Sequence, residues 1–150
     1  MEYQFLQSFL SNMDNMISFA IYGTAGNCVL VEGTLKNNHE LLDKIYGCIK
    51  CSISSTLPIF QLVGSNEDIF RCVKTGQTGF MGKSCDGNIL IAQKSSSASV
   101  IFLGHADFKG SYLYNITRGL KQQELLNNIN ANIDFVNFSV INHNKGRLKG

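Results

Sequence analysis

The residues that could do chemistry in this chain are few, and the most suggestive are Cys48 and Cys51. Their separation by two residues is typical of metal-binding and redox motifs. A zinc site needs a full set of ligands, however, and no second close pair of cysteine or histidine residues accompanies them. A redox motif of this kind opens a helix that follows a strand, whereas this pair closes a predicted helix. We therefore interpret both cysteines as structural or incidental thiols, and we expect no metal ion.

Histidine and carboxylate residues show no catalytic pattern either. His39, His105 and His143 stand apart from any recognisable nucleophile motif, and no two carboxylates have an interpretable spacing. The segment 76–84 contains glycine and lysine residues similar to those of a phosphate loop. It lacks the full P-loop pattern, because no glycine lies five residues before Gly82 and a strand is predicted to follow it. The sequence therefore predicts a protein that is not an enzyme and uses no cofactor.

The length and composition indicate a single globular domain. The chain has 150 residues, of which 44% are apolar and only 16% charged, and its net charge is +2. This charge is too small for counterion-driven binding to nucleic acid, and no apolar run approaches the roughly 18 residues of a membrane span. The N-terminus carries the acidic Glu2 and no basic segment, so we expect no signal peptide. Without a secretory route, the five cysteines are expected to be free thiols in a reducing compartment.

Two apolar strands in the middle of the chain organise the rest. Segments 88–93 and 100–103 are strongly apolar, and the serine-rich segment 94–99 between them is a turn. The dipeptide Asp86-Gly87 marks another tight turn, because glycine accepts a positive φ without steric cost. A short β-prone run, 79–83, leads into it. This stretch therefore predicts an antiparallel meander of three strands.

Around this meander, the spacing of apolar residues predicts three helices and further strands. Apolar residues three and four positions apart indicate helices over 2–10, 40–50 and 112–129. Short β-rich runs indicate strands over 17–22, 28–31, 59–63 and 69–73. Helices placed around an antiparallel sheet of about seven strands make an α+β layered domain.

The last twenty residues, 131–150, lie beyond the domain that we expect over 1–130. Ile133, Phe135, Phe138 and Val140 could form one extra strand. The segment ends in Asn, Lys, Gly and Arg residues, which are typical of a solvated or frayed end. We expect a C-terminal extension that is either an extra strand or partly disordered.

Lysines of the second half offer a surface that suggests a function. They fall at strand ends or in loops, and some are expected to share one exposed rim: Lys74, Lys83, Lys94 and Lys109. A basic rim beside Phe108 and either Tyr112 or Tyr114 suits an acidic protein partner. The alternative is that these are ordinary solvated lysines.

The order of elements and several segments resemble the profilins, a family of small proteins that bind actin monomers. MEYQFLQSFL resembles the opening helix, which in profilins carries a Trp-Gln-x-Tyr signature, with Tyr3-Gln4 standing for Trp-Gln. ISFAIYGTAGNCVLVEGTL resembles the first hairpin, GFMGKSCDGNILIAQKSSSASVIFLG the meander, and HADFKGSYLYNITRGL the start of the C-terminal helix. The resemblance covers roughly residues 2–128. It implies a sheet with both terminal helices on one face and the additional helix on the other.

The resemblance further implies a monomeric, cytoplasmic protein of the actin cytoskeleton that binds monomeric actin and regulates its polymerisation. Profilins cover the barbed-end face of actin with their last strands and the start of the C-terminal helix. By position, the actin-binding residues here would be Lys74, Lys83, Asn88, Phe108, Lys109, Gly110 and Tyr114. Phe108 would be a desolvated anchor, and the lysines would mainly speed the encounter with acidic residues of actin.

Two family traits are in doubt. Profilins bind proline-rich segments between their terminal helices, on an aromatic cluster that includes two tryptophans. The positions that would correspond here hold Tyr3, Leu6 and Val29, and the chain has no tryptophan. We therefore expect weak or absent binding of proline-rich proteins such as formins. The basic residues are too sparse to predict phosphoinositide binding.

A scaffold of similar layered design is the alternative. Roadblock and longin-type modules bind GTPases or vesicle proteins, and they pair through a sheet edge or a helix. Dimerisation in solution would favour this alternative, whereas a monomer that binds actin would exclude it.

Overall fold

The structure, a computed structural model, describes residues 2–50, 59–61, 69–106 and 111–149, with the backbone alone described for 59–61 and 131–149. In chain order the elements are α1 (Gln4–Ser11), β1 (Met16–Tyr22), β2 (Cys28–Gly33), the 3-10 helix η1 (Thr34–Asn37), α2 (His39–Lys50), β3 (Ile59–Gln61), β4 (Ile69–Thr75), β5 (Gly79–Lys83), β6 (Ile89–Lys94), β7 (Ser99–Gly104) and α3 (Tyr112–Lys149).

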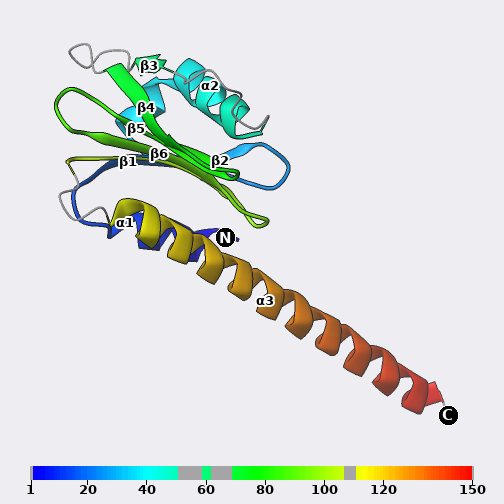
Figure 1. Ribbon diagram of the computed structural model, residues 1–150. Helices are drawn as coiled ribbons and strands as arrows, with labels where there is room; N and C mark the ends of the chain where they lie inside the picture. Colours follow the sequence, from blue (N-terminus) through cyan, green and yellow to red (C-terminus); the bar gives the residue numbers. More distant parts are fainter. Residues whose placement is uncertain (1, 51–58, 62–68, 107–110, 150) are drawn as a thin grey trace.

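The strands form one antiparallel sheet of seven strands in the order β2-β1-β7-β6-β5-β4-β3 (Figure 1). The predicted meander supplies β5, β6 and β7, and β7 is buried along its whole length. The turn between β5 and β6 contains Gly87 at φ +87°, the left-handed conformation expected of Asp86-Gly87. The main-chain N–H of Gly87 closes this turn by donating to the carbonyl of Ser84 at 3.0 Å.

Each face of the sheet carries its own apolar cluster, because side chains alternate along a strand. On one face, α2 packs Leu42 and Ile45 against Phe70 of β4 and Leu90 of β6. On the other face, the terminal helices cover a second cluster that includes Leu6, Phe19, Ile91, Phe102 and Ile116. Figure 1 shows α2 on one side of the sheet and α1 with α3 on the other. The predicted α+β class and the placement of the helices are confirmed.

The terminal helices lie against each other as well as against the sheet. Gly119 of α3 faces Phe9 of α1, and a Cβ at that glycine would come within 2.8 Å of the phenylalanine ring. The guanidinium of Arg118 lies 5.7 Å from the centre of the same ring. Gly119 therefore lowers the helix propensity of α3, but the missing Cβ allows the two helices to approach closely.

The C-terminal helix is much longer than the sequence predicts. α3 spans 38 residues and runs well past the sheet, so that the C-terminus lies far from the other elements (Figure 1). The extra strand that we considered for 131–150 is wrong. A strand needs a free sheet edge to pair with, and α3 carries the chain away from both edges, so the backbone keeps its helical hydrogen bonds instead.

Candidate partner-binding face

Strands β4 and β5 extend beyond the region that α1 and α3 cover, and their exposed residues form what we call the open flank: Arg71, Lys74, Met81 and Lys83. Residues directly opposite in an antiparallel pair point to the same face. Lys83 lies opposite Ile89, and Met81 lies opposite Ile91. Both isoleucines belong to the cluster under the terminal helices, so Lys83 and Met81 share that face. Arg71 and Lys74 lie opposite Lys83 and Met81, respectively, and join them.

The open flank is basic. Arg71, Lys74 and Lys83 are all exposed, and neither β4 nor β5 contains an aspartate or glutamate. Met81, between them in the register, is half-buried and packs against the cluster under the terminal helices. The flank therefore combines three fixed positive charges with an apolar centre, which suits a surface of a protein partner that carries carboxylates.

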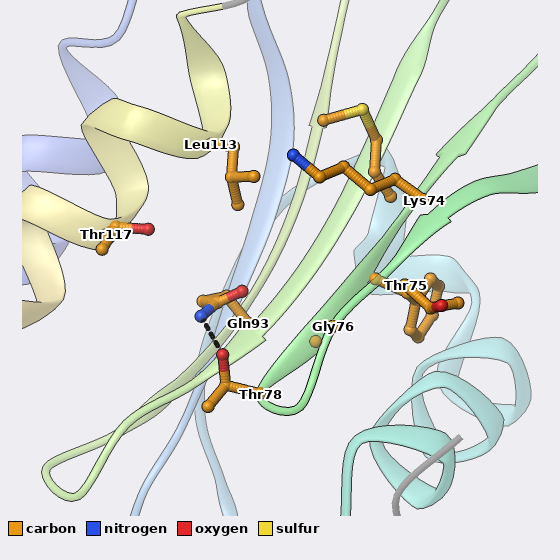
Figure 2. A pocket seen from close by; sticks show the side chains of 10 residues that line it. Lys74, Thr75, Gly76, Thr78, Gln93, Leu113 and Thr117 are labelled. Atoms are coloured by element: carbon orange, nitrogen blue, oxygen red, sulfur yellow. Dashed lines mark hydrogen bonds between the residues drawn. The ribbon is translucent and has the colours of Figure 1, made fainter. Parts of the chain in front are cut away.

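A cavity of about 180 Å³ lies where the open flank meets α3 (Figure 2). Its walls come from the hairpin of β4 and β5, from Gln93 of β6, and from Leu113 and Thr117 of α3. In Figure 2 the side chain of Lys74 extends along its upper rim towards Leu113. The cavity thus brings together the last strands and the first turn and a half of the C-terminal helix.

The lower wall of this cavity is held in place by a hydrogen bond and a close approach. The side-chain amide of Gln93 donates to the hydroxyl of Thr78 at 2.6 Å. A Cβ at Gly79 would overlap the main-chain carbonyl of Ala92, so only glycine allows β5 to lie this close to β6. The cavity is therefore preorganised, and a partner would lose little entropy in fixing it.

Asn88 lies at the far end of the open flank, beside Lys83, and it closes the turn between β5 and β6. Its main-chain N–H donates to the Ser84 hydroxyl at 3.1 Å, and its carbonyl accepts from the main-chain N–H of Ser84 at 3.0 Å. The side chain is half-buried. Lys83 and Asn88, both predicted from the sequence, are thus brought together by this turn.

The other predicted residues divide into two groups. Tyr114 is 68% exposed in the first turn of α3, and the guanidinium of Arg118 lies 5.9 Å from its ring. It sits on the helix next to the cavity-lining Leu113, but turned about 100° further round the axis. Phe108, Lys109 and Gly110 lie outside the described residues.

A proline-rich ligand would bind at the seam between the terminal helices. The residues predicted for that site are largely internal. Leu6 is fully buried, Tyr3 is 6% exposed, and Val29 is half-buried. The hydroxyl of Tyr3 donates to the carbonyl of Ser97 at 3.2 Å. Burial raises the pKa of Tyr3, with the nearby Glu2 carboxylate adding to the effect, so the phenol stays protonated. None of these three side chains presents an aromatic face to solvent.

Sequence reasoning missed Arg71 and the cavity. Arg71 stands in the alternating run of β4, between the buried Phe70 and Cys72, and that alternation was a usable sign of an exposed position. The cavity had no comparable sign, because its lining residues come from segments separated by as many as 43 residues, Lys74 to Thr117.

The structure gives no support for metal chemistry or a membrane span in the part of the chain that it describes. There, no group of three or more His, Cys, Asp or Glu residues is placed to hold a metal ion. Cys48 is half-buried in α2, and Cys51 lies outside the described residues. Among the described residues, no helix combines the length and the apolar character needed to cross a bilayer.

The architecture has close counterparts among solved structures. LokiProfilin1, in the crystal structure of its complex with rabbit actin, superposes with a TM-score of 0.60 at 13% identity, over 83% of this chain and 95% of its own. Profilin IB of Acanthamoeba castellanii superposes with a TM-score of 0.54 at 15% identity, over 80% of this chain and 91% of its own. The chain has a profilin fold.

LokiProfilin2, also solved in complex with rabbit actin, gives a TM-score of 0.56 at 12% identity, over 79% of this chain and 91% of its own. No protein-family model matches the sequence, and no curated protein matches it. The chain is therefore a divergent, profilin-like protein, and at these identities the likeness shows the fold alone. These profilins match nearly in full while part of this chain does not, in keeping with the long extension of α3.

Proposed function

We propose that this protein binds monomeric actin through the open flank and the start of α3, and so regulates actin polymerisation. The observation that carries the proposal is the open flank itself: three exposed basic residues around an apolar centre, on a profilin fold, beside a preformed cavity. Two proteins of similar fold, LokiProfilin1 and LokiProfilin2, form complexes with rabbit actin.

The residues of this face have distinct physical roles in the proposal. Arg71, Lys74 and Lys83 attract carboxylates of actin and mainly raise the association rate, because exposed charges act over a Debye length of about 8 Å at physiological salt. The cavity beside Lys74 admits one apolar side chain of the partner, which sets the lifetime of the complex. Phe108, Lys109 and Gly110 belong to the same proposed face, as do Asn88 and Tyr114.

Binding of this kind would act by mass action and not by catalysis. A monomer whose barbed-end face is covered cannot add to a filament through that face. In this proposal the protein is therefore a non-enzymatic regulator of actin in the cytoplasm and cytoskeleton, and it needs no cofactor. We further propose that it binds proline-rich segments weakly or not at all, because Tyr3 and Leu6 are internal and the chain lacks tryptophan.

Actin assembly kinetics test the proposal. The full chain, titrated into labelled actin monomers, is expected to slow spontaneous nucleation in proportion to its concentration. An isothermal titration with monomeric actin should show a saturating one-to-one complex. Unchanged assembly at saturating protein, together with no heat of binding, would refute the proposal.

A further inference from the structure

The second half of α3 leaves the domain and lies by itself. Figure 1 shows it running past the sheet and past α1, with no other described element beside it. The side chains mark where this begins, because Asn128, Ile129 and Asn130 are all exposed. Successive helical residues point about 100° apart, so three exposed neighbours leave most of the circumference of the helix uncovered. We call residues 128–149 the α3 extension, which is about 33 Å long at roughly 1.5 Å per residue.

A helix with the composition of the α3 extension needs a packing surface to be stable in water. Most helices in proteins are stabilised by burial of an apolar face and not by the propensity of their residues. Asparagine has a low helix propensity, and the extension contains six asparagines: Asn128, Asn130, Asn132, Asn137, Asn142 and Asn144. The rest of the described chain supplies no such surface, so the extension requires one from another molecule.

Exposed apolar side chains gather where the α3 extension begins. Four large apolar side chains are exposed in the described part of the chain, and three of them lie on α3: Tyr114, Leu125 and Ile129. Leu125 is 55% exposed and Ile129 51% exposed. A spacing of four residues puts these two on the same face of the helix. This face is therefore the one that a second molecule would cover, because water is a poor solvent for it.

The sequence continues this apolar face along the α3 extension in a heptad pattern. Apolar residues recur at alternating spacings of three and four, on a backbone that stays helical to Lys149. They take the a and d positions of successive heptads, and we call them the heptad stripe: Leu126, Ile129, Ile133, Val136 and Val140. Alternating spacings of three and four are the signature of a coiled-coil contact between two helices.

The positions on either side of the heptad stripe favour a second copy of this chain as the partner. Charges at the e and g positions of a coiled coil attract a helix of opposite charge and repel an identical helix. Here the e and g positions within 125–144 are all uncharged: Leu125, Asn130, Asn132, Asn137, Ser139 and Asn144. An identical helix therefore meets no repulsion, and it brings an apolar stripe of the same length. A different helix would gain no charge attraction that selects it.

We propose that the α3 extension pairs with the same segment of a second copy of the chain, as a coiled coil along the heptad stripe. The a and d residues of each helix then pack between those of the other. This contact goes beyond the proposed actin binding and leaves the open flank free, because the flank belongs to β4 and β5. The monomer implied by the resemblance to profilins concerns residues 2–128, and the α3 extension begins where that resemblance ends.

Sedimentation equilibrium of the full chain, from micromolar to submillimolar concentration, tests the pairing. The parent chain is expected to reach a mass at least twice that of one chain. Ile133→Asp and Val136→Asp should each raise the dissociation constant at least about a hundredfold, because pairing would bury an unpaired carboxylate from each copy. Phe138→Asp is the matched control. It also exchanges an apolar residue of the extension for aspartate, but at an f position outside the heptad stripe, so the mass should stay that of the parent.

Circular dichroism supplies a second measurement. The helical signal of the parent chain is expected to fall on dilution, as the pair separates, whereas that of Ile133→Asp should not depend on concentration.

Three results would overturn the inference. The first is a parent chain that sediments as a monomer at submillimolar concentration, which would leave the heptad stripe to a different partner. The second is a dimer that persists in Ile133→Asp, as pairing through a sheet edge would. The third is a Phe138→Asp variant that dissociates as readily as Ile133→Asp. Actin binding is measured separately, and Ile133→Asp should bind actin as the parent does, so failure of either proposal leaves the other standing.

Discussion

The side-chain amide of Gln123 donates a hydrogen bond at 3.0 Å to the main-chain carbonyl of Glu2, which joins the two ends of the folded domain. Gln123 is 2% exposed. Its side-chain oxygen also accepts from the N–H of Leu6 at 3.3 Å, and its amide donates to Asn127 at 2.8 Å. One side chain on α3 thus satisfies the main-chain N–H of Leu6, which has no partner within α1, and a carbonyl just before that helix.

Replacing Gln123 by alanine is expected to destabilise the fold by about 1–3 kcal/mol, because the buried main-chain N–H of Leu6 and the part-buried carbonyl of Glu2 lose their partner. Chemical denaturation followed by circular dichroism measures the change. The neighbouring Gln122→Ala is the control: Gln122 is exposed, so its loss should stay within about 0.5 kcal/mol. Equal stability of the two variants would contradict the role of Gln123.

Substitution by alanine should change the stability of the protein in opposite directions at two glycines, Gly104 and Gly47. A Cβ at Gly104 would lie 2.7 Å from the ring of the buried Tyr112, whereas a Cβ at Gly47 meets nothing within 4 Å. Gly104→Ala is expected to cost about 1–3 kcal/mol through overpacking. Gly47→Ala, inside α2, should gain up to about 1 kcal/mol of helix propensity. Thermal unfolding of both variants checks the signs.

Charge reversal on the open flank should weaken actin binding without loss of stability. Lys74→Glu and Lys83→Glu are each expected to lower the association rate several-fold, and the effect should shrink as salt rises, because exposed charges are screened. Stopped-flow measurements at low and high salt test this. Lys44→Glu, on α2, serves as the control and should leave the association rate unchanged at both salt concentrations. A salt-independent loss would point away from electrostatic attraction.

The segment before α3 should contain an apolar anchor for actin. Phe108→Ala is expected to weaken the actin complex by about 2 kcal/mol, mainly through faster dissociation, and Lys109→Glu to weaken it less. Melting temperatures of both variants should match that of the parent chain. If the affinity and the melting temperature fall together, these residues support the fold and do not form the contact.

A proline-rich peptide should not saturate the chain. The seam between the terminal helices offers the internal Tyr3 and Leu6, and a polyproline helix docks on exposed aromatic faces. Tyrosine fluorescence during a peptide titration is expected to show no saturable change up to millimolar peptide. Saturable binding that Tyr3→Leu abolishes would show that this seam opens.

Much of the fold could be predicted from local pattern. The alternation and turn residues of 79–104 were sufficient for the meander, and apolar spacing found α1, α2 and the beginning of α3. The length of α3 could not be predicted in this way. Ile133, Phe135, Phe138 and Val140 fit a strand pattern, and only the direction in which α3 leaves the sheet removes every edge that such a strand could pair with.

The candidate site depends on the register between strands, so it was harder to predict from the sequence than the fold. Strict alternation along β4 would put Lys74 on the same face as Phe70 and Cys72, towards α2. An irregularity in the pairing between Cys72 and Lys74 inserts one extra residue, so Lys74 instead lies opposite Met81 and faces the side of α3. A bulge of this kind leaves no mark in the sequence of β4 that we could use.

The sequence by itself determined the class of the protein: its apolar periods set which segments become strands or helices, because each must bury one side, and its sparse reactive residues gave no catalytic group. Only the tertiary structure decided which surface is available. The shift in β4 turns Lys74 towards α3, and Gln123 closes the terminal seam. Both depend on contacts between distant segments, whose geometry no local pattern contains.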